Sequence, residues 1–242
     1  MRRVISVAAA GLVAAAVVLC FALKRAGAAA ADDAAFLFFG GTDLWRYGAF
    51  INGGLLWSPD GINNDGFTLK TLLSGGVYTY NSGTLNETVH AATESAAILP
   101  GWRFAHDNVF VGIYAGAVVQ NFQLRPYDPG SRLHGLHFGG ELAADVWYQP
   151  TAATMVSVGG AITSIGPTGW LRSAFGVRLF DAFYAGPENQ DIWCGTFEEV
   201  QLGGHVTALR IGALEWSAGT GWAFTSDHRH GPYLRLGVNA RY

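Results

Sequence analysis

The feature that most constrains the fold is an alternation of apolar and polar residues in segments of about ten residues, separated by turn residues. The clearest segment runs from Leu136 to Tyr148: its large apolar side chains share one face, while His137, Glu141 and Asp145 share the other. A period of two places successive side chains on opposite faces of an extended chain. The segment therefore predicts a β-strand with one apolar and one polar face.

About twelve such segments follow one another, and an even number is expected when both termini lie on the same side of a membrane. Their expected centres are Phe38, Asn52, Leu72, Leu99, Ala115, Leu142, Val158, Phe175, Gly186, Gln201, Ser217 and Gly237. The longer connections are expected at Thr79 to Thr93, Leu124 to His134 and Thr225 to Gly231, with Ser58 to Gly66 the longest on the other side. The pattern predicts an all-β, antiparallel transmembrane β-barrel of about 12 strands with up-and-down topology.

A soluble β-sandwich is the alternative, because its strands alternate in the same way but turn their apolar faces inward. Composition favours the barrel. Half of the residues are hydrophobic and 14% are charged, whereas a soluble domain carries about 25% charged residues. No later segment has the eighteen or so apolar residues of a membrane helix. The net charge of −3 provides no basic surface for nucleic acid.

The first residues have the order of a secretory signal peptide. A basic start, Met1 to Arg3, precedes an apolar run from Val4 to Leu23 and an alanine-rich stretch from Ala26 to Ala31. This order predicts a cleaved signal peptide over residues 1–30 and a barrel domain over 31–242. The run is also long enough to cross a bilayer, so a retained helical anchor is the alternative. Export of a barrel predicts location in the bacterial outer membrane.

The carboxyl-terminal segment is the most specific single signal. Tyr242, Val238 and Leu234 share one face, and Arg241 and Arg235 share the other. A terminal aromatic residue on an amphipathic last strand resembles the signal that outer-membrane assembly machinery reads. Tyr242 is therefore the expected assembly signal.

Aromatic residues divide between the two predicted faces. Those with apolar parity are expected in an interfacial girdle: Trp57, Trp102, Tyr148, Trp216 and Trp222. Four others fall at the alternating positions of the polar face and are expected to face the lumen: Tyr114, Trp147, Trp170 and Tyr184. Rings in a polar lumen can stack on sugar rings or simply fill space, and the sequence leaves both open.

Charged residues of polar parity carry both signs. They are Lys70, Arg103, Glu141, Asp145, Arg172, Arg178, Glu188, Glu199 and Glu215. Charges held inside a narrow wall normally pair, so these residues predict a structural charge network. A catalytic carboxylate pair would need a defined separation and a substrate groove, which the sequence does not indicate.

Other chemistry has little support. His228 and His230 lack a third ligand, so no metal site is expected. No G-x-S-x-G, P-loop or H-E-x-x-H pattern occurs, and neither a cofactor nor catalytic residues are expected. Cys194 is the only thiol beyond the expected signal peptide, which excludes an intramolecular disulfide there.

The order and spacing of several short motifs resemble the BcsS family of cellulose biosynthesis proteins. The motifs are Asp43–Gly48, Gly53–Pro59, Gly66–Lys70, Leu99–Arg103, Tyr184–Glu188 and Glu215–Gly219. The resemblance covers essentially the whole expected mature chain. One departure is Asp191 to Cys194, expected as a loop that matches no family pattern.

The resemblance implies a non-enzymatic accessory role in cellulose biosynthesis, in which the protein assists export, anchoring or organisation of the β-glucan. It also implies a part in exopolysaccharide secretion and in biofilm formation. Outer-membrane lipid, cellulose and the cellulose synthase complex are the implied partners. A general small-solute channel and an outer-membrane lipid-modifying enzyme are the alternatives. Among the matching motifs, Gly186-Pro187-Glu188 is the leading candidate for a functional position, and a bend in an edge-like segment is its plain interpretation.

Overall fold

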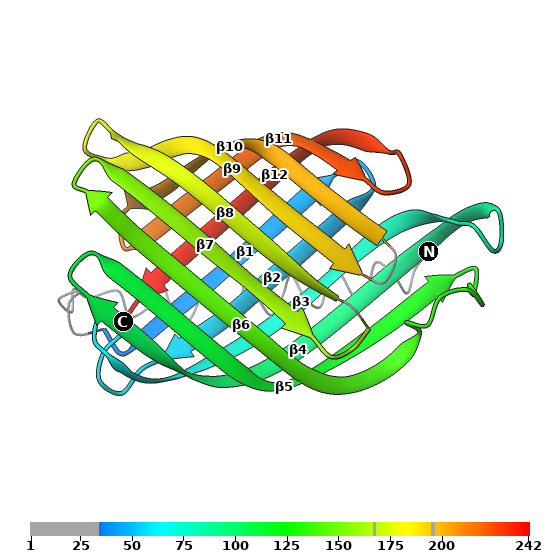
Figure 1. The fold of residues 1–242 in the computed structure, drawn as a ribbon, viewed down its shortest axis with the longest axis horizontal. Helices are drawn as coiled ribbons and strands as arrows, with labels where there is room; N and C mark the ends of the chain where they lie inside the picture. The colour runs from blue at the N-terminus through cyan, green and yellow to red at the C-terminus, as the bar shows by residue number, and fades with distance from the viewer. Residues whose placement is uncertain (1–33, 167, 195–196) are drawn as a thin grey trace.

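The alternating segments close into one barrel (Figure 1). In the computed structural model, which describes residues 34–166, 168–194 and 197–242, each strand pairs antiparallel with its sequence neighbours and β1 pairs with β12. The expected signal peptide, residues 1–30, lies outside the described residues. The strands are β1 (Phe36–Trp45), β2 (Gly48–Trp57), β3 (Gly66–Ser82), β4 (Glu87–His106), β5 (Val109–Arg125), β6 (Gly135–Thr151), β7 (Thr154–Thr163), β8 (Thr168–Leu179), β9 (Phe183–Cys194), β10 (Phe197–Ile211), β11 (Leu214–Thr225) and β12 (His230–Arg241).

The predicted fold class is confirmed. Each of the twelve expected centres lies in its own strand, and the topology is up-and-down. Closure leaves no strand edge without a partner, which a sandwich would have. No helix within the described ranges is long and apolar enough to cross a membrane.

Both ends of the described chain meet at one end of the barrel, which we call the near end; the opposite end is the far end. Phe36 and Tyr242 exchange two backbone hydrogen bonds of 2.9 Å there. The connection β2–β3, which spans residues 58–65, is the longest at the near end, as expected. The loop β5–β6 spans residues 126–134 at the far end, close to its expected bounds.

The expected long connection from Thr79 to Thr93 is wrong. Strands β3 and β4 stay paired from Thr79↔His90 to Ser82↔Glu87 and form an arm beyond the far end (Figure 1). The polar residues of this segment resemble a loop, but a strand pair that leaves the apolar belt needs no apolar outer face. Asp191 to Cys194, also expected as a loop, belongs to strand β9.

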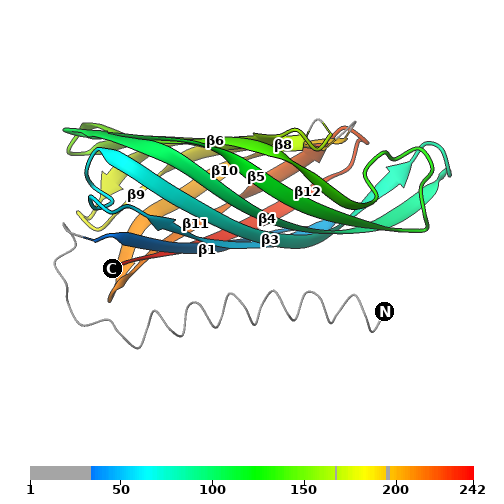
Figure 2. The ribbon, with the colours of Figure 1, turned by 90° about the horizontal axis from the view of Figure 1, so that it is seen from below.

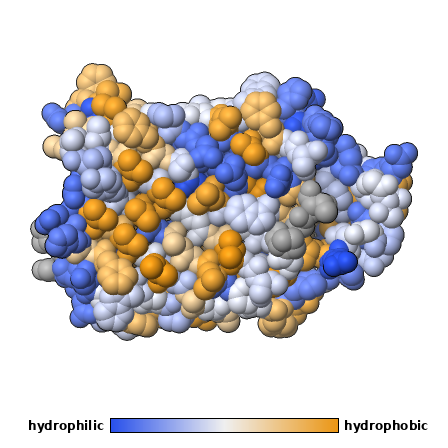
Figure 3. Space-filling view, viewed as in Figure 1, coloured by the Kyte–Doolittle hydropathy of each residue, from blue (hydrophilic) through white to orange (hydrophobic). Residues whose placement is uncertain are grey.

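The outer surface carries large apolar side chains, which Figure 3 shows in orange across one face. Phe138, Ile98 and Leu142 are exposed there. All five expected girdle aromatics have outward register positions. Soluble proteins rarely expose apolar areas of this extent, so the surface fits contact with lipid.

The barrel is flattened: Figure 2, seen at 90° to Figure 1, shows two walls lying close together. Flattening brings side chains from strands that are not neighbours into contact across the lumen. This shape positions the candidate site.

The last strand allows a direct test of the membrane barrel. Val238 pairs with Gly40 and Trp216 on the outer face, and the Tyr242 ring packs edge-on against Phe38 at 5.7 Å. Deleting Tyr242, or the substitution Val238→Asp, is expected to reduce assembly, because a lipid-facing carboxylate costs up to about 2 kcal/mol. Heat-modifiable migration on a gel measures assembly. The control Asn239→Lys places a charge at an inward neighbour, opposite Glu215, and normal folding of both test variants would contradict the membrane barrel.

Candidate functional site: the barrel lumen

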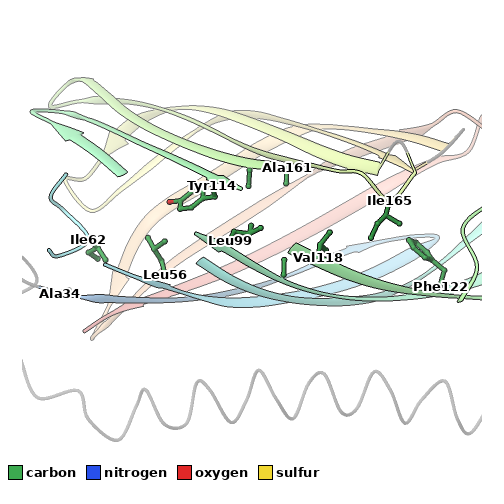
Figure 4. Close-up of a cluster of buried hydrophobic side chains, with 11 residues drawn as sticks. Ala34, Leu56, Ile62, Leu99, Tyr114, Val118, Phe122, Ala161 and Ile165 are labelled. Carbon is green, nitrogen blue, oxygen red and sulfur yellow. The ribbon is translucent and has the colours of Figure 1, made fainter. Parts of the chain in front are cut away.

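The lumen has two different sides. On β2 to β7, inward side chains form an apolar cluster that includes Leu56, Leu99, Tyr114, Val118 and Phe122, drawn in Figure 4. On β8 to β12 and β1, the buried inward side chains include a group of charged and polar residues: Asp43, Glu188, Glu199, Gln201 and His205. One side of the lumen is therefore a packed core, and the other is a polar wall.

The centre of the polar wall is Glu188, which lies between two arginines. Its Oε2 accepts hydrogen bonds from Arg172 Nε and Nη2 at 3.2 and 2.7 Å, and also one from Arg235 Nη2. The Tyr233 hydroxyl donates to Oε1 at 3.0 Å. A Cβ at Gly219 would overlap Oε1, so glycine leaves room for the carboxylate. We call Arg172, Glu188 and Arg235 the central triad; it joins β8, β9 and β12.

A chain of amides and carboxylates lies beside the triad. Asp43 on β1 accepts hydrogen bonds from Gln190 at 3.1 Å and from Gln201 at 3.2 Å. Gln201 also donates to Glu199 at 2.8 Å. These contacts connect β1 with β10 across two intervening strands and with β9 across three.

A second ion pair crosses the apolar side. Lys70 Nζ on β3 lies 2.6 Å from Asp145 Oδ2 on β6 and 4.8 Å from the centre of the Tyr114 ring. Arg103 lies over the Phe110 ring at 5.3 Å. Glu141 is buried in the same wall.

The remaining expected charges lie at the near end. Arg178 is 3.9 Å from Asp181, and Glu215 is within 4.0 Å of Arg210 and Arg241. The predicted lumen charges thus form separate groups instead of one network. The expected set omits Arg235 and Asp43. The parity of the last strand already indicated Arg235, whereas the apolar residues on both faces of β1 hid Asp43.

Two aromatic side chains narrow the far end. Tyr78 on β3 and Phe197 on β10 have ring centres 6.3 Å apart, although four strands separate them in the sheet. The Phe50 ring stacks on Tyr78 at 6.0 Å, and Cys194 lies beside Tyr78. We call Tyr78, Phe197, Phe50 and Cys194 the far-end constriction.

Contacts between turns strengthen the same end. Arg229 donates to the Thr79 backbone oxygen at 2.6 Å and lies 4.3 Å from the Tyr47 ring. In the β5–β6 loop, Asp128 accepts hydrogen bonds from Tyr80 and the Gly130 N–H, both at 2.9 Å. Desolvation acts to raise the pKa of Asp128, but the hydrogen bonds outweigh it and the pKa is lowered.

All four expected lumen aromatics have inward register positions, but they differ in access. Trp170 is 39% exposed, while Tyr114 is 2% exposed within the apolar cluster. Trp147 and Tyr184 pack edge to face at 6.1 Å. Tyr184 also lines a near-end cavity of about 390 Å³ together with Gln149 and Arg178.

Gly186-Pro187-Glu188 is not an edge, because β9 pairs with both β8 and β10. Proline has no N–H to donate, and the β8–β9 pairing is interrupted between Ala174↔Glu188 and Val177↔Ala185. His205 Nε2 instead donates to the Phe175 carbonyl oxygen at 3.0 Å. An inward histidine therefore restores the missing hydrogen bond.

His228 and His230 belong to the β11–β12 turn and the start of β12. No group of three or more His, Cys, Asp or Glu side chains in the described ranges is arranged to hold a metal ion. The site can offer paired charges, amides and a few aromatic rings to a ligand.

The solved structures similar to this barrel include a porin. The KdgM porin aligns with a TM-score of 0.50 at 10% identity, covering 85% of this chain and 99% of that chain. The same values hold for a structure described as the KdgM porin in complex with disordered oligogalacturonate. LpxR from Salmonella typhimurium gives 0.48 at 9% identity, covering 86% and 100%. At such low identity, the likeness to KdgM shows the fold alone.

No curated protein matches the chain. A family model described as cellulose biosynthesis protein BcsS matches residues 37–242, from the first strand to the last residue. This range covers nearly all of the described barrel and agrees with the resemblance read from the short motifs. The chain belongs to the BcsS family of cellulose biosynthesis proteins.

Proposed function

We propose that the protein is a non-enzymatic barrel of the bacterial outer membrane that assists export, anchoring or organisation of cellulose. The family match over nearly the whole barrel carries the proposal. The apolar outer surface supports the membrane location, because such a surface is stable in lipid. The cellulose synthase complex and the polysaccharide itself are the proposed partners.

The proposed glucan contact lies at Trp170. Its ring and the Asp145 carboxylate, which is 46% exposed, flank Gly159: a Cβ there would lie 3.7 Å from the ring and 3.4 Å from Asp145 Oδ1. Sugars present apolar C–H faces and polar hydroxyl edges, so an exposed ring beside a carboxylate is a suitable surface. Trp147 offers a second ring closer to the near end. The saccharide named with the KdgM structure gives fold-level support for a sugar-facing lumen.

A general small-solute channel is the second candidate, favoured by the likeness to a porin fold. Several contacts that cross the lumen argue against an open pore. They are the Lys70–Asp145 ion pair, the central triad and the far-end constriction. Side chains that meet across a barrel reduce its free cross-section. These contacts therefore favour an accessory role over bulk diffusion.

The decisive experiment compares a deletion strain with its parent. Synthase activity in isolated inner membranes is expected to persist, while surface cellulose falls or changes its organisation, because the barrel acts after polymerisation. Normal surface cellulose with altered uptake of small solutes would support the channel. Changed acylation of membrane lipids would support a lipid-modifying enzyme.

Replacing Trp147 and Trp170 together by alanine is expected to reproduce part of the deletion defect, at roughly 1 kcal/mol per lost ring contact. Surface cellulose and barrel folding are measured in the same cells. The control replaces Tyr148 and Leu171 by alanine, the outward neighbours on the same strands. Equal cellulose in both double variants would argue against stacking on these rings.

A further inference from the structure

One stretch of the outer wall, on β9, carries neighbouring polar side chains within a mostly apolar surface. The outward residues of β9 are Phe183, Ala185, Pro187, Asn189, Asp191 and Trp193, since Glu188 and Gln190 face the lumen. Two aromatic residues thus bound the outer face of β9, and Asn189 and Asp191 lie between them. In Figure 3 a blue patch interrupts the orange surface over β8 to β10.

The polar side chains of this patch are joined to one another. Ser173 on β8 donates to Asn189 Oδ1, and Asn189 Nδ2 donates to Asp191 Oδ2 at 3.3 Å. Asn189 pairs with Ser173 on one side, and the other register partners are exposed apolar residues: Asp191 pairs with Leu171 and Val200, and Asn189 pairs with Leu202. We call Ser173, Asn189 and Asp191 the β9 outer patch.

Other polar residues on the outer wall behave differently. The hydroxyls of Thr42 and Thr220 each donate to a backbone carbonyl of the neighbouring strand at 2.9 Å. Glu94 and Asn121, which pair with each other, lie toward the base of the far-end arm. The β9 outer patch instead places a carboxylate among exposed leucine and valine side chains.

A carboxylate in the hydrocarbon layer is costly, and ionisable groups there normally pair with a partner. The contacts of the patch supply none: its hydrogen bonds run from Ser173 through Asn189 to Asp191, and no ion pair in the described ranges includes Asp191. Its register partners on the two adjacent strands, Leu171 and Val200, are apolar. Within the described barrel, the Asp191 carboxylate therefore has a hydrogen bond but no opposite charge.

We propose that the β9 outer patch binds a membrane-embedded segment of another protein that presents a lysine or arginine to Asp191. The inference rests on the proposed outer-membrane location. The negative charge of Asp191 favours a partner that carries a positive charge over a second copy of this chain. A second copy docked through the same patch would bring two Asp191 carboxylates together, which is repulsive, whereas a basic side chain compensates the charge and Asn189 adds an interchain hydrogen bond.

Photocrosslinking in intact envelopes tests the docking. A photoreactive benzoylphenylalanine replaces Leu202, which pairs with Asn189, or Leu142, an outward residue of β6 that serves as the control. An adduct with a different protein is expected at position 202 and not at 142. The crosslinked peptide is expected to contain lysine or arginine within a membrane-embedded stretch.

Charge reversal makes the test specific. Asp191→Lys is expected to lower the adduct yield at least about tenfold, because like charges then face each other. Changing the partner's basic residue to aspartate is expected to restore it. Heat-modifiable migration confirms that each variant folds. Restoration by the swapped pair is a result that a purely structural role of Asp191 would not produce.

The purified barrel gives an independent readout. In lipid vesicles without a partner, Asp191→Leu is expected to raise the folded-to-unfolded ratio roughly tenfold, because a lipid-facing carboxylate is removed. Adducts between two copies, adducts with lipid only, or equal adducts at positions 202 and 142 would overturn the inference. Surface cellulose in the deletion strain tests the proposed function separately. If a different protein is crosslinked at position 202 but the deletion strain has normal surface cellulose, the docking inference stands and the proposed function is rejected.

Discussion

Replacing Glu188 by alanine is expected to destabilise the barrel by about 3 kcal/mol, because Arg172 and Arg235 then face each other without the carboxylate that joins them. Only 3% of the Glu188 side chain is exposed, while the arginines keep 22% and 14%. Their partial exposure places the expected loss at the low end of the range for a broken buried ion pair. Urea unfolding of the reconstituted barrel, followed by tryptophan fluorescence, measures it.

Two controls separate the buried triad from charge in general. Glu215→Ala removes a carboxylate whose ion pairs are 3.8 and 4.0 Å long at the near end, and it is expected to cost less than about 1 kcal/mol. Replacing all three triad residues by methionine or leucine is expected to recover much of the loss, because no unpaired charge remains. Equal effects of Glu188→Ala and Glu215→Ala would contradict a central role for the triad.

Replacing Tyr78 and Phe197 together by alanine is expected to raise the single-channel conductance in planar bilayers severalfold. The centres of the two rings lie 6.3 Å apart across the lumen, so removing both rings widens the far-end constriction. Phe50 loses its stacking partner and gains freedom to move aside. Reconstituted wild-type barrel is expected to conduct poorly under the same conditions.

The matched control for this double variant lies on the opposite face of the same strands. Val77 and Val200 point outward on β3 and β10, so replacing both by alanine removes bulk without opening the lumen. Conductance is expected to stay at the wild-type level in that control. An unchanged conductance in the Tyr78 and Phe197 double variant would show that another level of the lumen limits the pore.

The sequence by itself determined the strands and the face on which each side chain lies. The period of two is a local property of an extended chain, so it could be followed through Leu136–Tyr148 and the other segments without knowing their partners. All twelve strand centres and the inward positions of Trp147, Trp170 and Glu188 follow from this period. It failed for the arm of β3 and β4, where polar residues remain in strands outside the apolar belt.

Only the tertiary structure decided which inward residues meet. Lys70 pairs with Asp145, and Asp43 accepts a hydrogen bond from Gln201, although the strands in each pair are not neighbours. These contacts depend on the stagger of the strands and on the flattened cross-section of the barrel. Access differs for the same reason: Trp170 remains exposed in the lumen while Tyr114, of the same parity, is covered by the apolar cluster. The alternation of the sequence determines whether a side chain faces the lumen or the outer surface, whereas the shape of the closed barrel determines which side chain it meets across the lumen.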